Sequence, residues 1–214
     1  MSGLSASLRR FTRFGLGFRD FNSDGEIDLY VANGRVTHFD PRCETDALAE
    51  PNVLLRGTRP WTFEPVTPDG GTPAPLVATS RGVAFGDVDG DGALDIVVVN
   101  RDGPAHLLHN VCAPHGHWLQ VRALEEHGRD AFGAVASVTC GGRTFRRRIQ
   151  ADGSYASSSD PRAHFGFGST SGPVDVEMTW IDGAREVFVS QPLDRTIVLR
   201  RGSGQARDGL APKR

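Results

Sequence analysis

The feature of this sequence that most constrains its fold is an acidic loop within residues 85–100, which read FGDVDGDGALDIVVVN. Counted from Asp87, aspartates stand at positions 1, 3, 5 and 9 and a glycine at position 6 (Asp87, Asp89, Asp91, Asp95 and Gly92). A hard divalent cation would relieve the repulsion among these like charges by accepting carboxylate and backbone oxygens. Ca²⁺, which takes roughly 6 to 8 oxygen ligands in a flexible geometry, suits the loop better than Mg²⁺ or Zn²⁺. We therefore expect a calcium site, with the backbone carbonyl of Ala93 at position 7 as a further ligand.

The same pattern occurs 67 residues earlier (87 − 20 = 67), where residues 18–33 read FRDFNSDGEIDLYVAN. The predicted ligands of this first loop are the side chains of Asp20, Asn22, Asp24 and Asp28 and the carbonyl of Glu26. Both loops follow a phenylalanine and precede an apolar run that ends in asparagine, as expected of an internal structural repeat. The sequence thus predicts two structural Ca²⁺ sites. We expect tighter binding in the second loop, because Asn22 is neutral where the second loop has an aspartate.

The flanking residues exclude an EF-hand. An EF-hand loop lies between helices and has a bidentate glutamate at position 12, but position 12 is Val31 in the first loop and Val98 in the second. Residues 14–20 and 28–33 on either side of the first loop, and 80–85 and 95–100 around the second, have strand character. Each loop is therefore predicted to join two strands of a β-hairpin.

The composition favours an all-β protein of many short strands. The 214 residues include 26 glycines and 13 prolines but only 2 methionines. The change of pattern near residues 111–117 predicts a first unit at 14–114 and a second β unit, a small sandwich or barrel, at 115–201. In that second unit Leu119 and Val121 alternate with Gln120 and Arg122. We expect residues 202–214 to be a disordered tail.

Charge and hydropathy exclude two classes of partner. Residues 1–114 carry 10 Arg and 15 Asp plus Glu (10 − 15 = −5), and residues 115–214 carry 14 Lys plus Arg and 11 acids (14 − 11 = +3). Seven of the fifteen acids are loop aspartates, so the asymmetry is local and a nucleic-acid footprint is not indicated. No segment is apolar enough to span a bilayer, and the first residues have no signal-peptide core.

The two acidic hairpins resemble FG-GAP (VCBS-type) repeats, the calcium-loop blades of integrin-α-like β-propellers. The second half resembles the ASPIC/UnbV domain that follows such repeats in cartilage-acidic-protein-like proteins. This second resemblance is carried by five short motifs: HWLQV at 117–121, AFGAV at 131–135, DGSY at 152–155, HFGFG at 164–168 and MTWIDG at 178–183.

The resemblance implies a partial propeller of about two blades, followed by a small β domain, in a secreted or extracytoplasmic protein. Because a propeller closes with typically 4 to 8 blades, we expect a truncated reading frame or an open unit completed by a partner or a second copy. The implied function is a calcium-stabilised module that binds a protein or glycan. An alternative from a different class is an enzyme or accessory protein of enediyne-type specialised metabolism, with a pocket formed by His164, Asp152, Tyr155 or arginines.

Other residues that could carry chemistry have simpler explanations. Among the three cysteines Cys43 and Cys112 could pair, but the odd number favours free thiols. No zinc-like spacing joins Cys112 to the nearby histidines (His106, His109, His115 and His117). Ser154 lacks a nucleophile elbow, and the run 146–148 of three arginines is expected to be a solvated or ion-paired edge. We expect His164 to stabilise a turn, and Trp118 and Trp180 to lie in the core.

Overall fold

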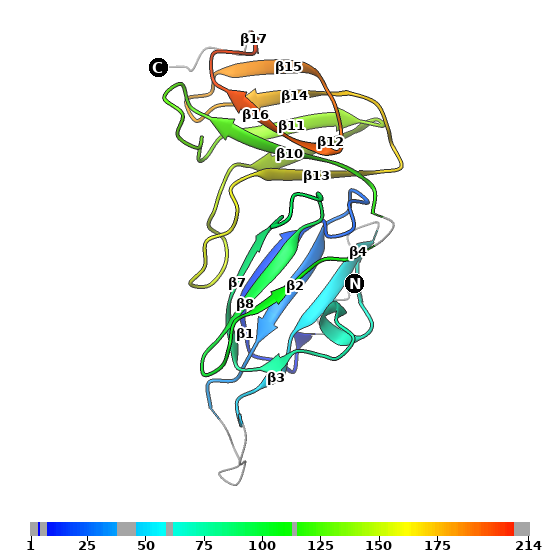
Figure 1. Cartoon of the computed structure of the whole chain (residues 1–214), viewed down its shortest axis with the longest axis vertical. Helices are drawn as coiled ribbons and strands as arrows, with labels where there is room; N and C mark the ends of the chain where they lie inside the picture. Colours follow the sequence, from blue (N-terminus) through cyan, green and yellow to red (C-terminus); the bar gives the residue numbers. More distant parts are fainter. Residues whose placement is uncertain (1–3, 5–7, 38–45, 59–61, 113–114, 208–214) are drawn as a thin grey trace.

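The computed structural model describes residues 4, 8–37, 46–58, 62–112 and 115–207. In these ranges the elements are seventeen β-strands and one 3₁₀ helix, η1 (Asp69–Gly71), so the prediction of an all-β protein is confirmed. Figure 1 shows two β units stacked along the long axis. Cys43, whose pairing with Cys112 was considered above, lies outside the described residues.

The first half of the chain contains two antiparallel sheets that pack together. One sheet has the order β1-β2-β4-β5, and the other has the order β7-β8-β9. Their bounds are β1 (Arg13–Arg19), β2 (Asp28–Asn33), β4 (Val53–Thr58), β5 (Thr62–Pro65), β7 (Ser80–Gly86), β8 (Asp95–Asn100) and β9 (His106–Leu108). A two-stranded ribbon joins β3 (Glu50–Pro51) to β6 (Val77–Ala78). The acidic loops connect β1 to β2 and β7 to β8, so both predicted hairpins are observed.

Both faces of the first sheet are buried, because side chains of β2 alternate between two apolar clusters. Tyr30 faces Phe85 and its neighbours between the two sheets, while Val31 packs on the opposite side near Leu8. The sheets approach closely where β1 meets β7, since a Cβ at Gly17 would lie 2.1 Å from the Phe85 ring. The described strands form two separate sheets rather than a closed ring, and the predicted number of propeller blades stays a prediction.

The second half is a β-sandwich. Its three-stranded sheet has the order β13-β10-β16, with β10 (His117–Leu124) parallel to β16 (Arg195–Arg200) and antiparallel to β13 (Ala163–Gly168). The five-stranded sheet has the order β12-β11-β14-β15-β17. Its strands are β11 (Val135–Cys140), β12 (Arg143–Arg148), β14 (Val174–Thr179), β15 (Arg185–Gln191) and β17 (Gln205–Ala206). One large cluster of buried side chains, including Phe165, Met178 and Trp180, fills the space between the sheets.

Two expectations about this half need correction. Residues 205–206 of the expected disordered tail form β17, which pairs with β15 and is secured by the Glu186 carboxylate on the backbone N–H groups of Gly202 and Gly204. Trp118, which was expected in the core, is buried but lies outside the cluster of side chains that forms the sandwich core. Among the described residues we find no helix with the length and apolar character that a membrane crossing needs.

Candidate metal centre

The two acidic loops share three internal hydrogen bonds at matching positions, which shows that the sequence repeat is a structural repeat. At position 1, Asp20 accepts from Gly25 N (2.9 Å) and Asp87 accepts from Gly92 N (3.0 Å). Position 5 accepts from the N–H of position 7 in both loops, at 2.8 Å. Position 9 accepts from the N–H of position 2 in both loops, at 2.9 Å. Gly25 and Gly92 have φ of +85° and +92°, conformations that glycine adopts at little cost.

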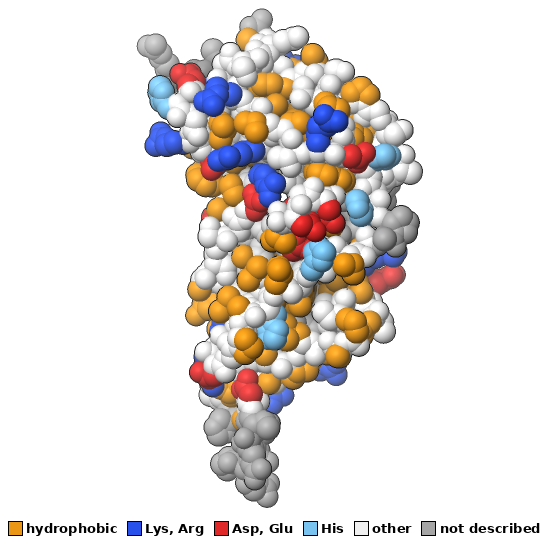
Figure 2. Space-filling view, in the orientation of Figure 1, with side chains coloured by type: hydrophobic (Ala, Val, Ile, Leu, Met, Phe, Trp, Pro, Cys, Tyr) orange, Lys and Arg blue, Asp and Glu red, His pale blue; other side chains and the backbone are white. Residues whose placement is uncertain are grey.

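The second loop brings its carboxylates together. Oxygens of Asp87, Asp89 and Asp95 all lie within 4.8 Å of one another, and Asp89 and Asp91 are as close to the ring of His109. His109 Nε2 lies 2.9 Å from Asp89, and this contact raises the pKa of the histidine and lowers that of the aspartate. A set of hard oxygen donors of this kind fits Ca²⁺. Figure 2 shows acidic side chains gathered at the middle of the molecule, with histidine side chains beside them.

The first loop is more enclosed and its carboxylates are less convergent. Asp20 and Asp28 are buried, and burial raises the pKa of Asp20 to about 7 and that of Asp28 to about 6. A bound cation would favour the ionised form of both groups. Asn22 donates from Nδ2 to Asp24 at 2.9 Å. The donors of this loop also fit Ca²⁺, which would be held by Asp20, Asn22, Asp24, Asp28 and the Glu26 carbonyl.

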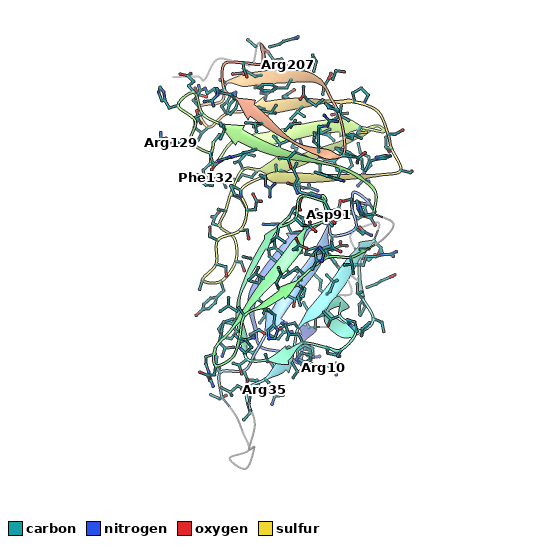
Figure 3. The ribbon with its side chains drawn as sticks, viewed as in Figure 1. Arg10, Arg35, Asp91, Arg129, Phe132 and Arg207 are labelled. Atoms are coloured by element: carbon teal, nitrogen blue, oxygen red, sulfur yellow. The ribbon has the colours of Figure 1, made fainter. Side chains whose placement is uncertain are left out.

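Both loops lie against the three-stranded sheet of the second half, at the junction where Figure 3 labels Asp91. Strand β13 has the sequence AHFGFG, in which Phe165 and Phe167 point into the sandwich core. The alternate residues face the loops: His164 Nε2 donates to Gly92 O (2.9 Å), and Gly168 N donates to Ser23 O (2.8 Å). A Cβ at Gly166 would lie 2.2 Å from Asp20 Oδ2, so the close approach depends on glycine.

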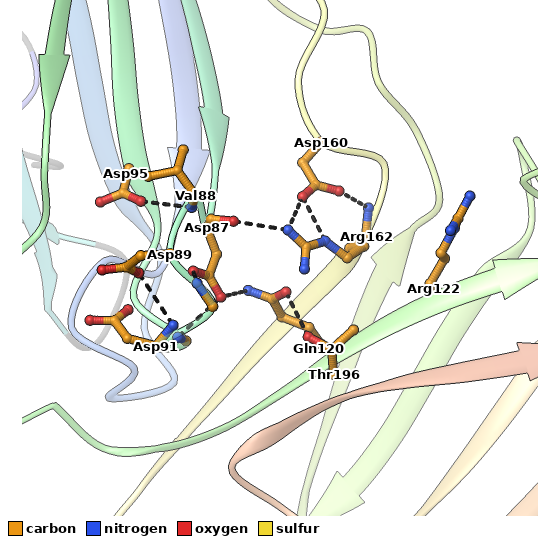
Figure 4. A network of polar contacts seen from close by, with 12 residues as sticks. Asp87, Val88, Asp89, Asp91, Asp95, Gln120, Arg122, Asp160, Arg162 and Thr196 are labelled. Atoms are coloured by element: carbon orange, nitrogen blue, oxygen red, sulfur yellow. Dashed lines mark hydrogen bonds and ion pairs between the residues drawn. The ribbon is translucent and has the colours of Figure 1, made fainter.

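Strand β10 makes the corresponding contacts with the second loop. Leu119 and Val121 point into the core, as predicted, and Trp118 and Gln120 face the loop. Gln120 Nε2 donates to Asp87 Oδ2 at 2.9 Å (Figure 4). A Cβ at Gly92 would lie 1.9 Å from the Trp118 ring, so this tryptophan covers the second acidic loop instead of joining the core.

An extended segment from β12 to β13 forms a further connection between the halves. Asp160 N donates to Phe85 O (2.9 Å), and Arg162 Nη2 donates to Asp87 O (3.0 Å) (Figure 4). The Tyr155 ring packs edge-on against Phe14 of β1, with centroids 5.1 Å apart. Residues 152–155, one of the five motifs, therefore lie against the first half of the chain.

Several sequence-predicted residues have structural roles. His164 is hydrogen-bonded to a turn, as expected, and burial lowers its pKa to about 4, so the ring is neutral. The histidines near Cys112 do not gather into a zinc site in the described part of the chain: His117 contacts Asp194, and His109 contacts Asp89. Cys112 and Cys140 are free. The arginine run lies on the edge strand β12, but its central member, Arg147, turns toward the junction and donates to His164 O.

Three contributors to the site were not identified from the sequence. Gln120 contacts a candidate ligand, Gly166 makes room for Asp20, and Asn110 donates from its backbone to Asp95 Oδ1 at 2.8 Å. Gly57 N donates to Asp28 Oδ1 in the same way, but it stands 29 residues after Asp28 whereas Asn110 stands 15 residues after Asp95, so the sequence repeat does not reveal this contact. The contacts with Gln120 and Gly166 connect the halves, so no local pattern could predict them.

Comparisons with known proteins agree with this two-part organisation. Residues 20–98 match the family model of the FG-GAP-like repeat, and residues 124–206 match that of ASPIC and UnbV. Cartilage acidic protein 1 of Xenopus tropicalis is 28% identical over 182 residues, which cover 77% of this chain and 25% of that protein. The Homo sapiens protein is 28% identical over 170 residues, with coverage of 77% and 24%. The chain thus spans about a quarter of the length of these curated relatives, and it contains a region similar to the FG-GAP-like repeat followed by a region similar to the ASPIC/UnbV domain.

Proposed function

We propose that this chain is a calcium-stabilised binding module in which Ca²⁺ in the two loops fixes the ASPIC/UnbV sandwich on the FG-GAP sheets. The observation that carries the proposal is the position of the loops. Both lie under β10 and β13, where alternate residues of two strands contact them directly. A cation that orders the loops would therefore order the surface on which the sandwich rests.

The energetic argument concerns carboxylates that are buried at this contact. Asp20, Asp28, Asp87 and Asp95 are all buried. Buried carboxylates are costly to ionise unless they are paired or coordinate a metal. Two bound Ca²⁺ ions would compensate this charge and hold each hairpin in the geometry that β13 recognises. Extracellular calcium modules bind with Kd of roughly 10⁻⁴ to 10⁻³ M, so such sites would be filled in a secreted protein.

The partner surface is best placed on the sheet β7-β8-β9. Its outer face exposes Val99 and Leu107, at 48% and 55%, and Val97 pairs with Leu107 across the strands. Strand β9 pairs only with β8 in the described part of the chain, which leaves an open edge. An apolar face beside an open edge favours a protein partner or a second copy of the chain over a glycan. Light scattering across a concentration series would detect self-association.

The test compares the chain with saturating Ca²⁺ and with EGTA, using thermal unfolding and small-angle X-ray scattering. We expect a single unfolding transition with Ca²⁺. With EGTA we expect a lower Tm and a larger radius of gyration, because the two halves separate. A stable monomer whose melting does not depend on Ca²⁺ would contradict the proposal.

A variant that substitutes no proposed ligand tests the contact between β13 and the first loop. Gly166→Ala inserts a methyl group against Asp20 and the Ser23 backbone, and we expect it to weaken docking by about 1–3 kcal/mol even with Ca²⁺. Gly103→Ala is the matched control, because its Cβ would meet only a carbon of Asn100 at 3.8 Å. Equal scattering profiles for the two variants would argue against the docking role of β13.

The positions of the residues named for the enzymatic alternative give that alternative less support than the binding module has. His164 lines a cavity at the junction, but Asp152 lines a different cavity and Tyr155 packs on Phe14. The Nε2–H of His164 is already used by Gly92 O. These three residues therefore do not form one pocket in the described structure.

A further inference from the structure

A cavity of about 160 Å³, lined by both charged and apolar side chains, lies at the junction of the two halves, next to the first acidic loop. Both halves contribute to its walls. Its charged lining residues are Arg19, Asp20, Arg146, Arg147, Arg148, Asp160 and Arg162. Five arginines thus face two aspartates, and the neutral His164 lies among them.

The two aspartates leave much of this positive charge uncompensated. Asp160 is fully engaged by Arg162, whose Nε donates to it at 2.6 Å. Asp20 accepts the N–H groups of Asp24 and Gly25. Among the described residues, no carboxylate lies within ion-pair distance of the guanidinium groups of Arg19 or Arg147, although both are half-buried.

Arg147 is the best-defined of these groups. Its Nε donates to His164 O (3.1 Å) and its Nη1 to Arg146 O (3.0 Å), which fixes the guanidinium plane over the Phe165 ring. Its Nη2 is buried and has no hydrogen-bond partner in the described structure. A buried donor without a partner is unfavourable, and an arginine fork matches the paired oxygens of a carboxylate, sulfate or phosphate.

Arg19 lies on the opposite wall, on β1, with its guanidinium carbon 5.2 Å from the centre of the Phe85 ring. Both arginines are half-buried in the cavity wall, and the negative charge of Asp20 offsets part of the charge of Arg147. Two like charges that share a partly desolvated cavity attract an anion between them. The volume suffices for one such group with a few waters, since a water occupies roughly 30 Å³ of liquid.

We propose that this cavity binds a small oxyanion group, a sulfate, phosphate or carboxylate, held between Arg147 and Arg19. None of the proposed calcium ligands is required to hold the anion, so a titration at saturating Ca²⁺ tests the anion site separately from the calcium function. Because residues of both halves line the cavity, a bound anion would also hold the two halves together. The edge strand β12 would then contribute Arg147 to anion binding.

The test is isothermal titration of the full chain, with saturating Ca²⁺ and at constant ionic strength maintained with chloride. The probes are sodium sulfate, methyl phosphate and sodium acetate, with the sulfate kept below the concentration at which calcium sulfate precipitates. We expect saturable 1:1 binding of at least one probe. Binding of sulfate and methyl phosphate alone would assign a tetrahedral oxyanion, and binding of acetate would assign a carboxylate.

Three variants decide whether binding occurs in the cavity. Arg147→Gln should weaken it by roughly tenfold or more, and Arg19→Gln by several-fold, because each removes a charged donor. Arg129→Gln, an equal charge change on the exposed surface labelled in Figure 3, should leave it within about twofold. The absence of saturable binding of all three probes, or equal weakening by Arg129→Gln and Arg147→Gln, would overturn the proposal.

If Arg147→Gln fails to fold, Arg147→Lys takes its place, because lysine keeps the charge and the apolar stem but not the planar fork. It should weaken binding by several-fold. Affinity equal to that of the unmodified chain in this variant would overturn the role of the guanidinium.

Discussion

The two acidic loops share one backbone design but contact the sandwich in different ways. The first loop contacts it mainly through its own backbone, since Gly168 N donates to Ser23 O and Gly116 N donates to Asn22 O (3.1 Å). The second loop is contacted by side chains, those of Gln120, His164 and Arg162. Asp89 and Asp91 of the second loop are exposed, whereas the first loop is more enclosed.

This difference shows that two copies of an internal repeat can keep the same loop geometry and still make different contacts with the rest of the protein. Gly116, just before β10, and Gly166 on β13 let the first loop approach closely, because a Cβ at either position would overlap the loop. The second loop keeps a larger distance that Gln120 and Trp118 fill. We therefore expect substitutions in the first loop to affect mainly the contact between the two halves, and substitutions in the second loop to affect mainly the affinity for the cation.

The largest expected effect comes from removing the position 1 carboxylate of each loop. Asp87→Ala should abolish the tighter of two calcium-binding events and lower that affinity by roughly a hundredfold or more, because three converging carboxylates lose one member. Asp20→Ala should remove the weaker event. Titration calorimetry distinguishes the two events, and equal heats in both variants would contradict this order.

A matched pair of glycine substitutions at position 6 tests the difference in surroundings. Gly25→Ala should cost about 1–2 kcal/mol, since its positive φ strains alanine but its Cβ would stay 3.2 Å from the nearest atoms. Gly92→Ala should cost about 3 kcal/mol or more, because the same strain adds to an overlap with the Trp118 ring. Urea unfolding with saturating Ca²⁺ measures the loss of unfolding free energy in each variant. Equal losses in the two variants would show that Trp118 moves aside without cost.

Converting the first loop to the charge of the second should make the two sites more alike. Asn22→Asp supplies a fourth carboxylate at position 3, and we expect calcium affinity of the first loop to rise roughly tenfold. Asn22→Ala, which removes the ligand, should lower it. An unchanged calorimetric profile in Asn22→Asp would mean that position 3 does not reach the ion.

The smallest effects are expected at position 7, where the backbone carbonyl is the predicted ligand. Ala93→Ser and Glu26→Gln should leave calcium affinity within about twofold. Glu26→Gln additionally loses an ion pair with Arg143 (2.9 Å) that connects the halves, which should cost up to about 1 kcal/mol of stability. A large loss of affinity in either variant would place a side-chain oxygen on the ion.

Much of the fold was predictable because its signals are local. Alternation in residues 118–124 predicted β10 with Leu119 and Val121 facing inward, and the acidic repeat predicted both hairpins. β13 was not predicted as a strand, since its HFGFG motif contains three polar or glycine positions that normally weaken a strand. β17 was missed because two exposed residues have little pattern of their own.

The sequence by itself determined the two hairpins and placed the acidic side chains within each loop, because a tight acidic turn depends only on residues that are adjacent in the chain. The tertiary structure alone decided what the loops contact. The contacts of Gly166 with Asp20, Trp118 with Gly92, and Gln120 with Asp87 join residues between 26 and 146 positions apart (118 − 92 = 26; 166 − 20 = 146). Packing of two separately formed β units creates such contacts, and neither unit has a periodic pattern that records the other.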